Sequence, residues 1–285
     1  MKQLALYLLG FSLLGSACQQ ADPELGPPPT EQDAQIFVEV SPNSNNILLF
    51  RCGNEQLLAT WDFGNQTGAK GTSVEGRFPY AGTYTVQVRV FNKGGSRTNS
   101  ITVTIDQDDL SLLDNPVFNA LTGGLDNGGV RTWRIDSMAA GHMGVGPDPE
   151  SAAGAIPEWW AANPADKTGC GIYDDLYTFS LSGFGFTMQT NGDVYVHNTI
   201  AAEFPGSFMN KGDYTAPYDD NIASTWNLIE EGDNAFLEIS GNAFLGFYSG
   251  VRTYRILEFS DTHISLQYKH HAGGLHWYIK LVPAQ

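Results

Sequence analysis

Alternating apolar and polar positions predict short β-strands over the first third of the chain. Ile36, Val38 and Val40 point to one side of such a strand, and Phe37 and Glu39 point to the other, which is the period of two that a strand requires. Further apolar or alternating segments, separated by turns that contain glycine and asparagine, span residues 47–52, 57–63, 83–91 and 100–105. About seven short strands in roughly seventy residues predict an immunoglobulin-like sandwich.

The same pattern continues beyond an acidic connector at residues 106–115. Strand candidates in residues 116–285 span 130–136, 176–181, 184–190, 194–198, 224–229, 235–240, 251–259, 263–268 and 275–281. Asn191-Gly192-Asp193 predicts a hairpin turn between two of them, and only residues 157–165 have the pattern of a short helical turn. We therefore expect an all-β protein: an immunoglobulin-like β-sandwich at residues 36–106, and a larger β-sandwich or jelly-roll-like domain at residues 116–285.

The N-terminus has the pattern of a secretion signal over residues 1–17. Lys2 precedes a short apolar stretch, and small residues lead to Cys18. This arrangement resembles the lipobox of bacterial lipoproteins, although Gly15 stands where leucine is usual. The resemblance implies a lipid on Cys18, while the alternative is an ordinary cleaved signal with an incidental cysteine. Residues 18–35 are rich in proline and predict a stiff tether.

The amino-acid composition excludes several classes of protein for this chain. The 285 residues carry 15 Lys+Arg against 31 Asp+Glu, a formal charge of −16, so no basic surface for nucleic acid is expected. Low charge with many aromatic residues excludes a disordered chain. With lipid on Cys18, the two remaining cysteines, Cys52 and Cys170, lie in different predicted domains, and we expect two buried free thiols.

Several motifs in the first domain resemble the PKD (polycystic kidney disease) domain family. They are Trp61-Asp62-Phe63-Gly64-Asn65, residues 78–86 with Gly82-Thr83-Tyr84, and Val90-Phe91-Asn92. The resemblance implies an immunoglobulin-like spacer domain in which Trp61 is a core ring and Tyr84 is a corner tyrosine that bonds the backbone. Gln66-Thr67-Gly68 replaces the family's usual short turn, which predicts a longer loop.

The second domain holds five of the six tryptophans. Trp133 and Trp226 lie within predicted strands, so we expect core rings. Trp159 and Trp160 instead lie in a loop at residues 141–171, where two adjacent rings cannot easily both be buried. An exposed indole packs well on the apolar face of a sugar ring. The alternative is a loop that folds back as a lid with both rings buried.

Other candidate ligand residues surround these rings along the sequence. The full set of predicted glycan-binding residues is Trp159, Trp160, Trp277, His142, Asp174, Asp175 and His271. The pairs Asp174-Asp175 and Asp219-Asp220 could also hold a structural calcium ion, although no dedicated calcium loop is present. His270-His271 near Gly273-Gly274 lacks the spacing of a zinc motif. Contact with a ligand near the glycine turn is at least as good an interpretation as zinc binding.

Motifs of enzymes are absent. The chain contains no Gly-x-Ser-x-Gly elbow and no phosphate-binding loop, and it lacks the Glu-x-Asp-x-x-Glu strand motif of laminarinases. No catalytic residue is therefore predicted. A carboxylate pair such as Glu158 with Asp174 on an unfamiliar fold would be the alternative.

Motifs of the second domain resemble the C-terminal domain of PKD-containing lipoproteins in Bacteroidota-type polysaccharide-utilisation systems. They are residues 132–137, 141–147, 157–160, 173–179, 191–193 and 277–282. The resemblance implies an outer-membrane lipoprotein exposed at the cell surface, where it captures a polysaccharide such as a laminarin-like β-1,3-glucan, near a glycan-import complex. A glycoside hydrolase and a structural or adhesive lipoprotein are the rival interpretations.

Overall fold

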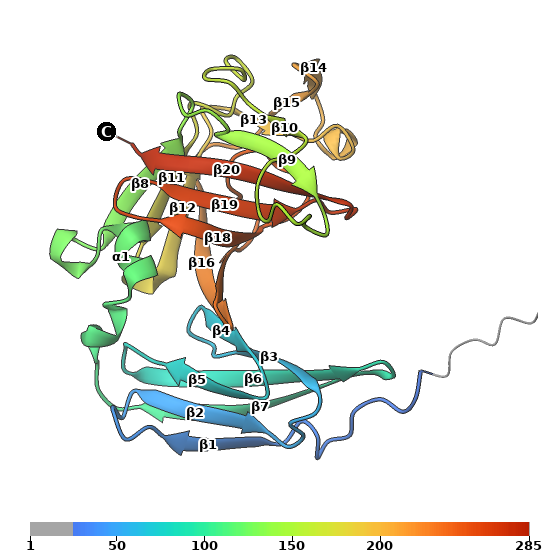
Figure 1. Ribbon diagram of the computed structural model, residues 1–285. Helices are drawn as coiled ribbons and strands as arrows, with labels where there is room; N and C mark the ends of the chain where they lie inside the picture. Colours follow the sequence, from blue (N-terminus) through green and yellow to red (C-terminus); the bar gives the residue numbers. More distant parts are fainter. Residues whose placement is uncertain (1–24, 285) are drawn as a thin grey trace, which may run out of the picture.

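The computed structural model describes residues 25–284, and β-strands make up most of its secondary structure (Figure 1). The all-β prediction is confirmed. No helix in this range is long and apolar enough to cross a membrane. The predicted signal peptide and the lipid anchor at Cys18 lie outside the described residues.

The first domain is a sandwich of seven strands. They are β1 (Ile36–Val40), β2 (Ile47–Cys52), β3 (Leu58–Asp62), β4 (Thr67–Lys70), β5 (Ser73–Arg77), β6 (Gly82–Asn92) and β7 (Gly95–Ile105). One sheet has the order β1-β2-β5 and the other the order β4-β3-β6-β7. Trp61 is buried between them and donates its indole N–H to the Gly71 carbonyl at 2.8 Å. The Tyr84 hydroxyl donates to the Tyr80 carbonyl at 2.8 Å, so both predicted roles are confirmed.

Part of the proline-rich segment packs on this sandwich. The side-chain amide of Asn92 donates to the Pro27 carbonyl at 3.1 Å, and that of Asn99 donates to the Ala34 carbonyl at 3.1 Å. Ala34 is fully buried. Residues 27–34 therefore extend the surface of the first domain rather than forming a free tether.

The second domain is built on eight strands that pair in a closed circuit. The order is β12-β11-β8-β20-β19-β18-β17-β16, and β12 also pairs with β16. The strands of the domain are β8 (Val130–Ile135), β9 (Met143–Pro147), β10 (Trp160–Ala161), β11 (Leu176–Ser180), β12 (Gly185–Gln189), β13 (Asp193–Val196), β14 (Phe208–Asn210), β15 (Asp213–Pro217), β16 (Ile222–Glu231), β17 (Asn234–Ile239), β18 (Thr253–Phe259), β19 (Ile264–Lys269) and β20 (Leu275–Pro283). Trp133 and Trp226 are fully buried inside the circuit, which confirms their predicted core positions.

Two local predictions for this domain are wrong. Residues 157–165 form no helix, because Trp160 and Ala161 pair with β9 as a strand. Asn191-Gly192-Asp193 does turn the chain, with Asn191 at a φ of 51°, but its flanking strands do not pair. β12 pairs with β11 and β16, whereas β13 pairs with β15. The turn therefore transfers the chain from one sheet to another.

Helices are few and short. The α-helix is α1 (Pro116–Thr122), and the 3-10 helices are η1 (Leu110–Leu113), η2 (Leu125–Asn127), η3 (Ser182–Phe184) and η4 (Ala201–Glu203). Asn115 caps α1 by accepting from the backbone N–H groups of Val117 and Phe118. Gly123 ends the helix in the left-handed conformation at a φ of 83°, as a C-terminal glycine typically does.

The two domains share a strand pairing. Residues 66–68, predicted as a longer loop, lead into and begin β4, which pairs with β16 in parallel with the register Thr67↔Leu228. The Lys70 ammonium lies 2.8 Å from the Glu231 carboxylate. The edge of the first domain is therefore covered by the second domain, and the two sheets become continuous.

We expect Gly68→Ala to weaken this junction. A methyl group on Gly68 would lie 2.6 Å from the Trp61 carbonyl oxygen, so β4 must shift; overpacking of this kind costs about 1–3 kcal/mol. In calorimetry, the two domains of the variant should unfold in two separate thermal transitions. In the wild type, these two transitions should lie closer together. Gly185→Ala is the matched control, because its nearest neighbour would be 3.5 Å away. Identical traces for the two variants would contradict the proposed coupling.

Candidate functional site

Trp159 and Trp160 lie on a short hairpin at the rim of the second domain. Trp160 pairs with Val145, and the Trp159 backbone N–H donates to the Val145 carbonyl at 3.0 Å. Trp159 is 58% exposed and Trp160 is 37% exposed. Neither ring is buried, so the hairpin does not form the closed lid of the alternative interpretation.

Lys167 fixes the position of the Trp160 ring. Its ammonium lies 5.1 Å from the centre of that ring and 5.0 Å from the centre of the Tyr195 ring. It also donates to the Tyr195 hydroxyl at 3.0 Å and to the Lys211 carbonyl at 2.9 Å. Burial lowers the pKa of Lys167. The contact occupies part of Trp160, which leaves Trp159 as the more accessible of the two rings.

Three predicted ligand residues are buried and cannot contact a surface ligand. The His142 ring is held between the Ala139 carbonyl at 2.8 Å and the Tyr173 hydroxyl at 2.6 Å. Asp175 accepts from the Tyr177 hydroxyl at 2.8 Å, and burial raises the pKa of its carboxyl well above the usual value. Trp277 packs on Phe247 with ring centroids 4.6 Å apart. These side chains make contacts inside the domain instead.

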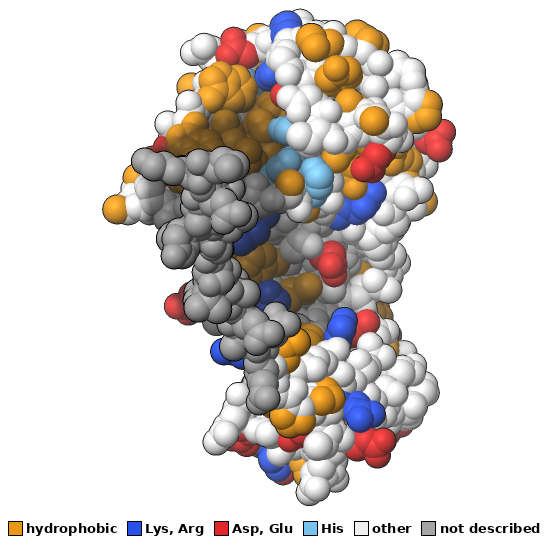
Figure 2. Space-filling view, turned by 90° about the vertical axis from the view of Figure 1, so that its right-hand side faces the viewer, with side chains coloured by type: hydrophobic (Ala, Val, Ile, Leu, Met, Phe, Trp, Pro, Cys, Tyr) orange, Lys and Arg blue, Asp and Glu red, His pale blue; other side chains and the backbone are white. Residues whose placement is uncertain are grey.

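The other two predicted residues are exposed but lie on separate parts of the domain. Asp174 accepts a hydrogen bond from the Asn191 side chain through its backbone carbonyl at 2.8 Å. His271 belongs to a cluster of histidines, which gather on the face shown in Figure 2. The structure therefore does not bring the seven predicted residues together into one site.

The histidine cluster consists of His197, His270 and His271 around the Thr199 hydroxyl. The ring nitrogens lie 2.8, 3.4 and 3.1 Å from that oxygen, in the same order. Burial, with His197 and His271 adding repulsion, lowers the pKa of His270 to about 4. Within residues 25–284, no group of three or more His, Cys, Asp or Glu side chains is placed to hold a metal ion. The structural calcium ion stays a prediction.

An open hollow lies on the outer face of strands β17 to β20. Its volume is about 650 Å³. The strand register places one residue of each strand in a row across this face: Phe236↔Arg255, Arg255↔Gln267 and Gln267↔Tyr278. Residues 148–150 form the opposite wall. We call this feature the sheet-face hollow.

A connected polar network lines the sheet-face hollow. One guanidinium nitrogen of Arg255 lies 2.8 Å from the Glu150 carboxylate, and another donates to the Asn234 side chain at 3.0 Å. The Gln267 amide donates to Glu150 and to the Tyr278 hydroxyl, each at 3.0 Å. The side chains of Arg255 and Glu150 are only 33% and 27% exposed. Their donors and acceptors are therefore held in fixed directions.

The remaining lining balances the charge of the sheet-face hollow. Asp148 lies 3.3 Å from the Lys269 ammonium and 3.6 Å from His276. Two carboxylates thus face one guanidinium and one ammonium, and Phe236 and Val251 add apolar surface. Such a mixture of fixed donors, acceptors and an aromatic ring suits a neutral ligand rich in hydroxyl groups.

Analysis of the sequence missed every residue of this network. Glu150 and Arg255 are 105 positions apart, and Glu150 and Gln267 are 117 positions apart, so no local spacing connects them. One weak signal was present. Arg255 alternates with the core residues Tyr254 and Ile256, which places it on the outer face of its strand.

We expect the stability of the domain to fall in acid because of His270. Its pKa is lowered from 6.5 to about 4 in the fold, so the unfolded chain binds more protons between these values. The stability contributed by the neutral ring is complete above pH 6.5 and is lost as the pH falls. His270→Phe should flatten the dependence of the thermal midpoint on pH. His263→Phe, at an exposed histidine, is the control; equal slopes in both variants would refute this assignment.

Comparison with known proteins assigns the first domain to a family. A family model described as the PKD domain matches residues 38–105. The PKD1 domain of the Vibrio cholerae metalloprotease PrtV is 22% identical, with a TM-score of 0.22, and the match covers 26% of this chain and 95% of that one. The PKD1 domain of Vibrio anguillarum Epp is 20% identical, with a TM-score of 0.23, and the match covers 29% and 96%.

One similar structure extends over both domains. It comes from work on carbohydrate-binding modules of the β-sandwich superfamily; it is 14% identical, has a TM-score of 0.24, and the match covers 92% of this chain and 93% of that one. No curated protein matches the chain. The match of the family model agrees with the buried Trp61 and the Tyr84 corner described above. Residues 38–105 form a PKD domain.

Proposed function

We propose that the protein is a non-catalytic polysaccharide-binding lipoprotein of the cell surface, and that the sheet-face hollow is its binding site. The observation that carries this proposal is the fixed network of Glu150, Arg255, Gln267 and Asn234 beside the Phe236 ring. Sugar hydroxyls both donate and accept hydrogen bonds, so they match a surface that offers both kinds of group. The apolar face of a pyranose can pack on the aromatic ring.

Trp159 offers a second aromatic surface in the same domain, outside the lining of the sheet-face hollow. Trp160 pairs with Val145, and Val145 pairs with the buried Trp277, so Trp160 points toward the core side. Trp159 lies just before β10, and its ring is 58% exposed. We propose that a polysaccharide chain longer than the hollow also stacks on Trp159.

The roles of the two carboxylates favour binding over catalysis. Glu150 holds Arg255 and Gln267 in place, and Asp148 is engaged by Lys269 and His276. A glycosidase instead needs one carboxyl that gives its proton to the leaving oxygen and a second that acts as base or nucleophile. We propose a neutral β-glucan of the laminarin type as the polysaccharide, because the charged groups of the hollow balance.

We expect Arg255→Ala to weaken polysaccharide binding. The variant removes the donor at the centre of the network, and losing hydrogen bonds of a charged group costs about 1.5–3 kcal/mol, equivalent to roughly 10- to 150-fold in affinity. Affinity electrophoresis in gels with laminarin, mixed-linkage glucan, xylan or alginate measures the retardation. Arg134→Ala, on strand β8 and outside the lining of the hollow, is the matched control.

The same gels separate the two tryptophans. Trp159→Ala should reduce retardation more than Trp160→Ala, because Lys167 already contacts the Trp160 ring. If none of the four glycans retards the wild-type protein, the proposed function is refuted. Release of reducing sugar from any of these glycans would indicate a glycoside hydrolase instead.

We propose attachment to the outer membrane through lipid on Cys18, at a position from which the protein could serve a glycan-import complex. The signal pattern of residues 1–18 supports this proposal. Cys18→Ala should move the protein from the membrane fraction to the soluble fraction of cells, measured by fractionation and immunoblotting. Cys52→Ala is the control, because Cys52 is a buried free thiol. Membrane retention of the Cys18 variant would exclude this anchor.

A further inference from the structure

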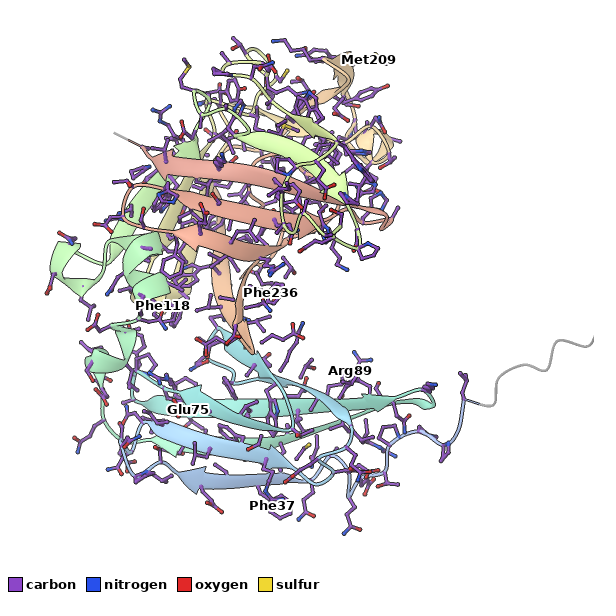
Figure 3. All side chains as sticks on the ribbon, in the orientation of Figure 1. Phe37, Glu75, Arg89, Phe118, Met209 and Phe236 are labelled. Atoms are coloured by element: carbon purple, nitrogen blue, oxygen red, sulfur yellow. The ribbon has the colours of Figure 1, made fainter. Side chains whose placement is uncertain are left out.

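Lys70 of the PKD domain reaches the edge of the sheet-face hollow. It ends strand β4, and its ammonium lies 5.2 Å from the centre of the Phe236 ring. The same ammonium lies 2.8 Å from the Glu231 carboxylate. Figure 3 places Phe236 on the side of the second domain that faces the PKD domain. A side chain of one domain therefore contacts an aromatic ring that lines a hollow of the other.

Strand register extends the polar network of the hollow toward Lys70. The pairing of β4 with β16 ends one residue before Lys70 and Glu231, which then form their ion pair. Glu231 lies opposite Asn234 on β17, and the Asn234 side chain accepts from Arg255 at 3.0 Å. Charged and polar side chains thus follow one another from the PKD domain to the centre of the hollow.

We propose that the PKD domain forms part of the polysaccharide site and that Lys70 is a binding residue at its rim. This inference rests on the proposed function. The lysine ammonium carries three N–H donors on a flexible stem, and its contact with Phe236 holds these donors beside the aromatic surface. Phe236 still lines the hollow beside this contact, so a sugar that packs on the part of the ring facing the hollow would place its hydroxyl groups within reach of the ammonium.

The ion pair with Glu231 leaves Lys70 available for this role. The two side chains are 41% and 47% exposed, and an ion pair between exposed groups contributes only about 0–1 kcal/mol. A ligand hydroxyl can therefore replace or share this partner at little cost. The arrangement also gives the PKD domain a function beyond spacing, because the strand pairing holds Lys70 at the hollow.

Isothermal titration of the full chain tests the role of Lys70. The ligand is the glycan of the panel above that retards the wild type most strongly. Lys70→Ala should raise the dissociation constant about tenfold, the loss expected when a charged donor is removed. Lys93→Ala, in the distant turn between β6 and β7, is the matched control and should bind as the wild type does.

A third variant separates the ammonium from its ion pair. Glu231→Gln breaks the pair but keeps Lys70, so its affinity should equal or exceed that of the wild type. Thermal midpoints confirm that each variant is folded. If the wild type binds and Lys70→Ala matches Lys93→Ala, the inference is overturned while the proposed function stands. If the wild type binds no glycan, the proposed function fails and this inference fails with it.

Discussion

The parallel pairing of β4 with β16 determines how the two domains lie and what their shared edge presents. A strand at the edge of a sheet leaves backbone N–H and carbonyl groups unpaired, and proteins cover such edges. Here each domain covers an edge of the other over the short register from Thr67↔Leu228 to Glu230↔Ala69. Because backbone hydrogen bonds set this register, Lys70 is brought to Glu231 and Phe236.

Local sequence signals predicted the PKD domain well. Trp61, Tyr84 and the turn glycines act within a single sandwich, and each has one physical role that neighbouring residues reveal. The segment after Asn65 departs from the family's usual pattern, and a longer loop was the natural expectation. Its actual partner, β16, lies about 160 residues further along the chain, as the 161-residue separation of Lys70 and Glu231 shows. No local signal could have identified that partner.

In the second domain, still more of the structure depends on contacts between distant segments that local sequence signals cannot predict. Its main strands were predicted close to their observed positions, but the closure of β12 onto β16 depends on pairings between distant segments. Turn chemistry at Asn191 gave the correct bend and the wrong partner. His142 and Asp175 were predicted as ligand residues because they lie near the two loop tryptophans along the sequence. Both are buried: the His142 ring bonds the Tyr173 hydroxyl, and Asp175 accepts from the Tyr177 hydroxyl.

The proposed function gives the polar network of the sheet-face hollow a role that stability alone does not supply. Its central ion pair, Arg255 with Glu150, is about one-third exposed, and removing charges of this kind from water offsets much of their attraction. Apolar side chains in the same row would stabilise the strands at least as well. The polar groups instead hold one another in fixed orientations, because one carboxylate oxygen of Glu150 accepts hydrogen bonds from both Arg255 and Gln267. Groups held in this way lose little freedom when a ligand binds, which reduces the cost of association.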